Sequence, residues 1–225
     1  IVTDRKKLTY GFENADVMAR NLRVEDGMTK FSVVTSEGLD FGEYEMQLFG
    51  EHNVMNALAV IITCMQLNIE LKKIKEGLAN FQGVVRRFDI RVKNEKVCYI
   101  DDYAHHPKEL EATIASIRNL YPNRYMIGVF QPHLYSRTRD FATEFANALS
   151  MMDELVLLPI YPAREKPIEG VTSENIRLKV ESIKPMVAKV VEKSELVAYL
   201  RKRCNEINSP CVVATMGAGD IDRCV

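Results

Sequence analysis

Two aspartates and two histidines lie within a short stretch of this chain, where an apolar segment ends and a helix is expected to begin. The pairs are Asp101 with Asp102 and His105 with His106, and Pro107 follows directly. Proline suits the first position of a helix, since its missing N–H has no partner there in any case. Carboxylates and imidazoles are groups that transfer protons in active sites, and a helix N-terminus favours anions. We therefore expect a functional site at this junction.

The chain has four histidines, and the other two also lie in dense polar motifs. His52 stands in Gly-Glu-His-Asn, and His133 stands in Gln-Pro-His-Leu-Tyr-Ser-Arg, which ends at Arg137. A guanidinium group can bind a carboxylate or a phosphate through two parallel hydrogen bonds. His105 and His133 could orient a nucleophile or exchange protons with it, and Asp102 could accept hydrogen bonds from ribose hydroxyls.

The elements that must position these residues follow from the pattern of apolar segments. Beyond residue 85, strands and helices are expected to alternate, which predicts an α/β domain with a mostly parallel, doubly wound, Rossmann-like sheet. The expected strands are 88–92, 97–100, 125–130, 154–160, 186–191 and 211–215, and the expected helices are 107–120, 138–150, 173–180 and 194–205.

Polar, turn-rich segments follow four of these strands. They begin at Asp101, Gln131, Tyr161 and Met216, and the last contains Gly-Ala-Gly. Ligands bind in open α/β sheets beyond the carboxyl ends of the strands. We therefore expect all four segments at one edge, where they would form a site for an anionic substrate.

The N-terminal part has a different pattern. Alternating apolar residues and turns over residues 1–49 predict antiparallel β-hairpins, and helices are expected from Asn53, as the N-cap, to residue 67 and over residues 70–81. The amides of Asn53 and Asn56, one helical turn apart, could read the edge of a base together with His52. A change of pattern near residue 85 predicts two domains, 1–85 and 86–225.

Composition excludes several classes of protein. The net charge of −1 provides no field for nucleic acid or an anionic membrane, and no apolar run has the length of a membrane span. The five cysteines are scattered and odd in number, which favours a reducing, cytoplasmic setting. No signal peptide opens the chain, and because it begins at Ile1 without a methionine we expect a fragment of a larger protein.

Several motifs resemble those of the Mur ligase family of bacterial cell-wall synthesis, and the similarity covers essentially the whole chain. The motifs are Gly-Glu-His-Asn-Val-Met-Asn-Ala from Gly50, Gly-Val-Val-Arg-Arg-Phe from Gly83, Asp-Asp-Tyr-Ala-His-His-Pro from Asp101, Phe-Gln-Pro-His-Leu-Tyr-Ser-Arg-Thr from Phe130, Tyr-Pro-Ala-Arg-Glu from Tyr161 and Met-Gly-Ala-Gly-Asp from Met216.

The resemblance implies the end of a central ATPase domain, with a hairpin and helices, followed by a complete C-terminal ligase domain. It also implies an ATP-dependent ligase that joins L-alanine to the muramoyl carboxylate of UDP-N-acetylmuramate through an acyl phosphate, with Mg²⁺ on the phosphates, in peptidoglycan synthesis. By the resemblance, His52, Asn53 and Asn56 would hold the adenine, Arg87 the ATP phosphates and Asp102 the ribose. Tyr103, His105, His133 and Arg137 would line the amino-acid and muramoyl side, with the last three catalytic.

Two departures from the family pattern matter. Leu134 stands where the family often has arginine directly after the histidine of Gln-Pro-His. The family's N-terminal domain, its phosphate loop and its usual magnesium ligands are not part of this sequence. We therefore expect no metal ligands in this chain and no ligation by it alone.

Three other interpretations stay open. One is the related recycling ligase that joins a whole tripeptide to UDP-N-acetylmuramate, although Tyr103 stands where phenylalanine would be expected there. Another is a metal-dependent hydrolase built on the two aspartates and two histidines between Asp101 and His106. The last is a non-catalytic module that binds a nucleotide or an amino acid.

Overall fold

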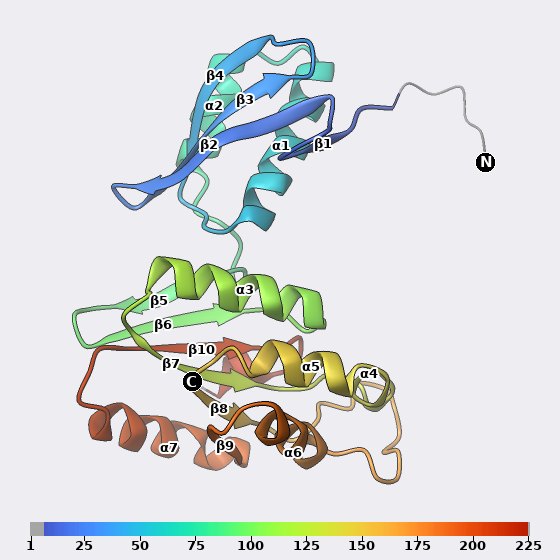
Figure 1. The fold of residues 1–225 in the computed structure, drawn as a ribbon, viewed down its shortest axis with the longest axis vertical. Coiled ribbons are helices and arrows are strands. Elements are labelled where there is room, and N and C mark those ends of the chain that lie inside the picture. Colours follow the sequence, from blue (N-terminus) through green and yellow to red (C-terminus); the bar gives the residue numbers. More distant parts are fainter. Residues whose placement is uncertain (1–6, 225) are drawn as a thin grey trace. The chain divides into compact units, whose positions relative to one another are not determined.

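The computed structural model describes residues 7–224, which divide into two compact units (Figure 1). One unit ends at Gly83 and the other begins at Val84. Residues 1–6 of the first expected domain and residue 225 of the second lie outside the described residues.

The first unit is a four-stranded sheet with two helices. Its strands, in spatial order, are β1 (Tyr10–Gly11), β2 (Val17–Glu25), β3 (Met28–Thr35) and β4 (Asp40–Met46). Strands β2, β3 and β4 pair antiparallel, as the turn pattern predicts. The prediction is wrong for β1, which pairs parallel to β2. Beside this pair, the Asp16 carboxylate accepts hydrogen bonds from the backbone N–H and the hydroxyl of Thr9, both at 2.7 Å.

Helix α1 (Glu51–Gln66) begins earlier than expected, and α2 (Leu71–Asn80) follows it. Gly50, with a φ of 95°, is the N-cap of α1, so the expectation that Asn53 caps this helix is wrong. Glycine adopts that left-handed backbone conformation without steric cost. The Asn53 amide instead donates a hydrogen bond of 2.8 Å to the carbonyl of Phe49.

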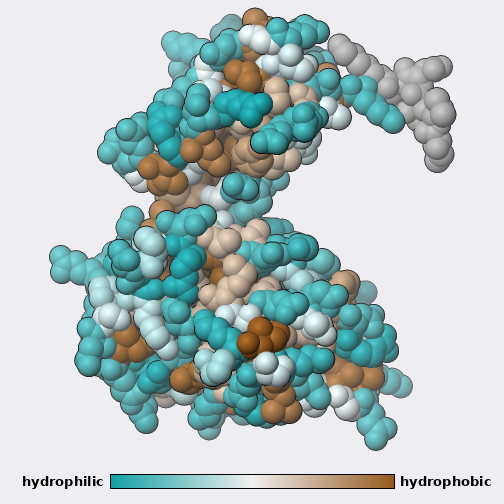
Figure 2. All heavy atoms as spheres, viewed as in Figure 1, coloured by the Kyte–Doolittle hydropathy of each residue, from teal (hydrophilic) through white to brown (hydrophobic). Residues whose placement is uncertain are grey.

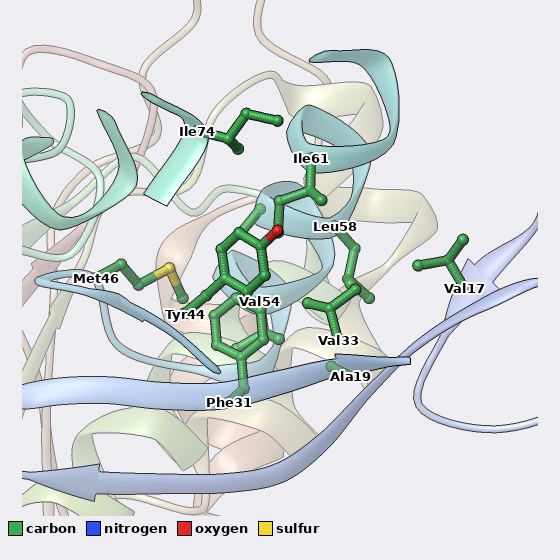
Figure 3. Packing of buried hydrophobic residues seen from close by; sticks show 11 residues of the cluster. Val17, Ala19, Phe31, Val33, Tyr44, Met46, Val54, Leu58, Ile61 and Ile74 are labelled. Atoms are coloured by element: carbon green, nitrogen blue, oxygen red, sulfur yellow. The ribbon is translucent and has the colours of Figure 1, made fainter. Parts of the chain in front are cut away.

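The core of the first unit lies between the sheet and the two helices (Figure 3). Phe31 from β3 and Tyr44 from β4 stack with ring centroids 6.0 Å apart. Val54, Leu58 and Ile61 of α1 meet these rings and are fully buried. Their spacing of four and three residues produces one apolar helical face.

The second unit contains a six-stranded sheet, which confirms the predicted α/β class with a mostly parallel sheet. Its spatial order is β5-β6-β10-β7-β8-β9, and only β5 is antiparallel to its neighbour. The strands are β5 (Asp89–Lys93), β6 (Val97–Asp102), β7 (Tyr125–Phe130), β8 (Glu154–Leu157), β9 (Val187–Val190) and β10 (Cys211–Met216).

Helices connect the parallel strands. They are α3 (Pro107–Leu120), α4 (Tyr135–Asp140), α5 (Ala142–Leu149), α6 (Ser173–Ile183) and α7 (Lys193–Glu206), with a 3₁₀ turn η1 (Ile221–Arg223) near the C-terminus. The single helix expected over 138–150 is two helices, broken at Phe141. The Phe141 ring packs edge-on against His106 and Phe145, and this packing accompanies the break.

The sheet of the second unit has helices on both faces (Figure 1). Helices α3, α5 and α6 lie side by side on one face. On the other face, Leu196 and Leu200 of α7 pack into a buried cluster with Val213 of β10. Alternate residues of each strand therefore enter different cores, as a doubly wound sheet requires.

The visible surface of each unit is mostly hydrophilic, as expected from the ordinary composition of the chain. Figure 2 shows hydrophilic residues over most of the visible face of each unit, with hydrophobic residues in small separate patches. Within residues 7–224, no helix combines the length and the apolar character needed to cross a membrane.

Gly128 in β7 provides a test of core packing. A Cβ atom at this position would overlap the side chain of Met152, so we expect Gly128→Ala to lower the free energy of unfolding of the second unit by about 1–3 kcal/mol. Hydrogen exchange of the β7 and β10 amides measures this stability. In a Met152→Ala background the added cost of Gly128→Ala should largely disappear. An equal cost in both backgrounds would contradict this explanation.

Candidate active site

The carboxyl ends of four strands of the second unit lie level with one another. In the parallel register, Met216 of β10 stands beside Asp102 of β6 and Phe130 of β7, and Phe130 stands beside Leu157 of β8. The four polar segments that follow these strands therefore start from one edge of the sheet, the position at which open α/β folds bind ligands.

Arg86 connects two of the segments at this edge, those that begin at Asp101 and Met216. Its guanidinium donates hydrogen bonds to the carbonyls of Gly217 at 2.6 Å and Gly219 at 3.1 Å. It also forms ion pairs with Asp222, at 3.1 Å, and with Asp101, at 3.4 Å. Asp101 is buried, and its other oxygen accepts a hydrogen bond from a threonine of β10. This Arg86 clamp attaches the start of the unit to the glycine loop after β10.

The glycine loop itself lies against Gln131, the first residue after β7. A Cβ atom on Gly217 would stand 2.8 Å from the Gln131 carbonyl oxygen, and one on Gly219 would overlap the Gln131 side chain. Gly217 also has a φ of 146°, which side-chain-bearing residues rarely adopt. Gly217 is therefore required by a close approach of backbone to backbone, and Gly219 by the close approach of the Gln131 and Tyr161 side chains.

Asp220, at the end of this loop, holds the loop to α7. Its carboxylate accepts hydrogen bonds from Lys193 at 2.5 Å and from Gln131 at 3.0 Å. Burial alone would raise the pKa of Asp220, but the bonds from Lys193 and Gln131 outweigh burial and lower the pKa below its ordinary value. The carboxylate is therefore charged at neutral pH.

Asp102 organises the segment around it. Its two oxygens accept hydrogen bonds of 2.7 Å from the backbone N–H groups of Phe88 and Ala104. The adjoining Tyr103 N–H donates to the Arg86 carbonyl at 2.7 Å. Phe88 and Arg86 both have positive φ values, so these bonds hold a strained entry into β5. The expected contact of Asp102 with a ribose stays a prediction.

The two adjacent histidines have different surroundings. His106 is the N-cap of α3, and its ring nitrogen accepts a hydrogen bond from the Lys108 N–H. His105 points elsewhere: its Nδ1 lies 3.0 Å from the Tyr103 carbonyl and 3.2 Å from the Glu109 carboxylate. The Glu109 carboxylate also accepts hydrogen bonds from the backbone N–H groups of His105 and His106. These contacts with Glu109 and with the Tyr103 carbonyl position the His105 ring.

His105 faces His133 across the edge, with ring centroids 6.1 Å apart. The His133 ring stacks on Tyr161 at 5.6 Å. Burial lowers the pKa of His133, and the nearby positive charge of Arg137 lowers it further. The imidazole is therefore neutral at neutral pH.

Two polar atoms at this point remain available to a ligand. Neither His133 Nδ1 nor Arg137 Nη1 has a hydrogen-bond partner among residues 7–224, and both atoms are buried. Such groups are costly to leave unpaired in a folded protein. A bound anion or carboxylate would satisfy both.

Glu165 fixes the helix that carries Arg137. Its carboxylate accepts hydrogen bonds from the backbone N–H of Ser136 at 2.9 Å and from the Ser136 hydroxyl at 2.5 Å. The hydroxyl bond is the main reason that the pKa of Glu165 is lowered. Leu134, just before α4, has a φ of 71°, a strained value for a leucine.

The structure brings together the expected site residues of the second unit. The ring centroids of Tyr103 and His105 are 5.4 Å apart. The guanidinium carbon of Arg87 lies 5.5 Å from the Tyr103 ring centroid. With His133, these residues form a continuous row along the edge.

The three expected adenine contacts belong to the first unit. His52, Asn53 and Asn56 all lie in the first part of α1. Asn53 is buried and its amide is bonded internally, whereas Asn56 is exposed. The two amides are therefore not equivalent.

The described part of the chain contains no group of three or more His, Cys, Asp or Glu side chains arranged to hold a metal ion. Asp101 is engaged by Arg86 and Thr215, and His106 caps α3. This arrangement of donors gives no support to the metal-dependent hydrolase.

Comparison with known proteins supplies the family. The glutamate ligase domain of Mur ligases matches residues 86–219, which is more than half of the chain, and the Mur ligase middle domain matches residues 2–64. The chain belongs to the Mur ligase family.

Named relatives are found at high similarity. This Mur ligase chain is 43% identical over 225 residues to the UDP-N-acetylmuramate–L-alanine ligase of Flavobacterium psychrophilum, covering 98% of the chain and 47% of the relative. It is 44% identical over 217 residues to the enzyme of the same name from Cytophaga hutchinsonii, covering 96% and 45%. The chain thus spans about half the length of the curated relatives that it matches.

Solved structures agree on the fold. The UDP-N-acetylmuramate–alanine ligase of Thermotoga maritima superposes with a TM-score of 0.76 at 27% identity, over 96% of this chain and 46% of that one. A murein peptide ligase from Psychrobacter arcticus gives a TM-score of 0.62 at 17% identity, over 96% and 44%. The second likeness shows the fold alone.

Sequence reasoning missed the residues that position the site of this Mur ligase. Arg86, Gln131 and Glu165 were not expected to have particular roles, yet each joins two of the polar segments. The one available signal was the pair of glycines at Gly217 and Gly219, whose close approach requires a specific neighbour.

Arg86→Met tests the Arg86 clamp. The substitution leaves Asp101 buried without its cation, and removing one partner of a buried ion pair costs about 3–5 kcal/mol. We expect the free energy of unfolding of the second unit to fall by about 3 kcal/mol, measured by hydrogen exchange of its sheet. Arg87→Met, at the exposed neighbouring arginine, should change it by less than about 0.5 kcal/mol. Similar losses in both variants would disprove the clamp.

The lowered pKa of His133 can be measured directly by NMR titration of its ring. We expect a midpoint below the ordinary value of about 6.5. Arg137→Gln removes a nearby positive charge and should raise the midpoint towards that value. Arg139→Gln is the matched control, because Arg139 is exposed and paired with Asp140. If the His133 midpoint is the same in the wild type and in Arg137→Gln, the charge of Arg137 does not lower this pKa.

Proposed function

We propose that the protein from which this chain derives is an ATP-dependent ligase, which joins L-alanine to the muramoyl carboxylate of UDP-N-acetylmuramate in peptidoglycan synthesis. The observation that carries the proposal is the pair of unpartnered buried atoms, His133 Nδ1 and Arg137 Nη1, at the ligand-binding edge. The names of the relatives support the substrate assignment.

The roles of the residues follow from their surroundings. The muramoyl carboxylate is first phosphorylated by ATP, and the amine of L-alanine then attacks the acyl phosphate. Arg137 would bind the carboxylate or acyl-phosphate oxygens, since its Nη1 is buried without a hydrogen-bond partner among the described residues. His133, neutral at working pH, would accept a proton from the incoming ammonium group. His105, held by Glu109, and Tyr103 would complete the wall of this pocket.

The nucleotide contacts are proposed for both units. His52, Asn53 and Asn56 would hold the adenine, Arg87 the phosphates and Asp102 the ribose. The exposed Asn56 fits this role more directly than Asn53, whose amide is already bonded.

Mg²⁺ on the phosphates would offset their developing charge in such a reaction. The residues between 7 and 224 do not provide a three-ligand site for it, and we assign no step to them through the metal. All five cysteines are free thiols, which suits the cytoplasmic setting that we propose.

The alternative substrate is a tripeptide. The murein peptide ligase of Psychrobacter arcticus shares the fold, and we keep the tripeptide-recycling reaction as the second candidate. The higher identity to L-alanine ligases favours the first.

Phosphate release by the intact parent protein distinguishes these substrates. With ATP, Mg²⁺ and UDP-N-acetylmuramate present, we expect release that depends on L-alanine and not on the tripeptide. Arg137→Gln should lower kcat/KM by at least about 100-fold, because it removes a charge-assisted contact to the reacting group. Arg139→Gln should leave it near the wild-type value.

Other outcomes would contradict the proposal. Release with the tripeptide alone would assign the recycling reaction, and release with neither would reject ligation. The isolated chain of residues 1–225 should release no phosphate, and measurable L-alanine-dependent release by it would refute that expectation.

A further inference from the structure

We propose that Cys204 and Cys211 form a peroxide-sensitive pair that closes into an intramolecular disulfide. Cys204 lies in the last turns of α7, and Cys211 is the first residue of β10. The Cys211 thiol donates a hydrogen bond to the Cys204 sulfur, and the two sulfur atoms are 3.8 Å apart. A disulfide bond is about 2 Å long, so closure requires a small movement of the short connection between them.

The two thiols differ in access to solvent. Cys211 is fully buried, whereas Cys204 is partly exposed. Cys204 also lines an open groove of about 560 Å³ between α7 and the sheet, together with Tyr99, Leu200 and Val213. A small neutral oxidant can therefore reach Cys204 first, and Cys211 is protected behind it.

Electrostatics produces the same asymmetry. The hydrogen bond from Cys211 lowers the pKa of Cys204, and the charges of Lys96 and Arg203 add to this effect. Burial and the carboxylate of Glu154 oppose it but do not reverse it. The pKa of Cys211 is raised by the same contact. Cys204 is thus the thiol that ionises more readily to the reactive thiolate, and Cys211 stays protonated more readily.

The chemistry balances with hydrogen peroxide as the oxidant. The Cys204 thiolate attacks one peroxide oxygen, the O–O bond breaks, and a sulfenic acid and hydroxide form. The Cys211 sulfur then attacks the Cys204 sulfur, the S–O bond breaks, and water leaves. In total, two thiols lose two hydrogen atoms and one peroxide is reduced to two waters.

The disulfide would lie away from the candidate active site. Cys211 pairs with Val97 and Tyr125 at the starts of their strands, whereas the site lies where those strands end. Oxidation would join α7 to β10 without touching His133 or Arg137. Closing before irreversible oxidation would also protect Cys204 from the sulfinic and sulfonic acids.

Thiol mapping of the wild-type chain tests the proposal. The reduced chain is treated with hydrogen peroxide, remaining thiols are blocked with N-ethylmaleimide, and peptides are identified by mass spectrometry. We expect two of the five thiols to be lost, with one linked peptide that joins Cys204 to Cys211 and separates on reduction. Cys64, Cys98 and Cys224 should stay reduced during peroxide treatment and be recovered as N-ethylmaleimide adducts.

Substitutions separate the two roles. Cys211→Ser should leave a sulfenic acid at Cys204, detected with dimedone, and should form no linked peptide. Cys64→Ser, the control at a partly exposed cysteine of the first unit, should form the disulfide as the wild type does. The proposal is overturned if no Cys204–Cys211 peptide forms, or if Cys204 is oxidised no faster than Cys64. The wild-type mapping decides the question even if a variant does not fold.

Discussion

The ion pair between Arg86 and Asp101 is the interaction on which the geometry of the second unit depends. Asp101 is buried next to the last residue of β6, where an unpaired carboxylate would be strongly destabilising. Arg86 neutralises it and uses its remaining N–H groups on the carbonyls of Gly217 and Gly219. One guanidinium therefore connects the first residues of the unit, the end of β6 and the loop after β10.

The polar groups at the site divide into two kinds. The Asp102 bonds and the Glu165–Ser136 bonds are made within the protein, and Arg86 and Asp101 form an ion pair. His133 Nδ1 and Arg137 Nη1 are the contrasting case, buried and without partners in the described chain. Polar groups that bond to one another hold the scaffold rigid. Ligand binding then does not have to supply the free energy of ordering them. A ligand that bonded to the two unpartnered atoms would gain binding energy from them.

Much of the fold could be predicted because local and tertiary signals agree. Proline at 107 and an apolar run over 125–130 indicated α3 and β7 with their observed bounds. Placing polar residues after strands was sufficient to expect His105 and His133 at one edge, since parallel strands end together. Other features depended on tertiary contacts that no local pattern encodes. The helical pattern is broken at Phe141, whose ring packs against His106 and Phe145, and Gly50, rather than Asn53, caps α1.

The adjacent arginines show most clearly where sequence reasoning ends. Arg86 and Arg87 are identical in type and neighbours in the chain, and sequence alone assigned a role only to Arg87. The positive φ of Arg86 turns its side chain inward to the carbonyls of the glycine loop, while Arg87 stays exposed beside Tyr103. That φ is maintained by Tyr103 N–H on the Arg86 carbonyl and by Asp102 on Phe88. The difference between the two arginines is therefore set by residues more than a dozen positions away, at the end of β6 and directly after it.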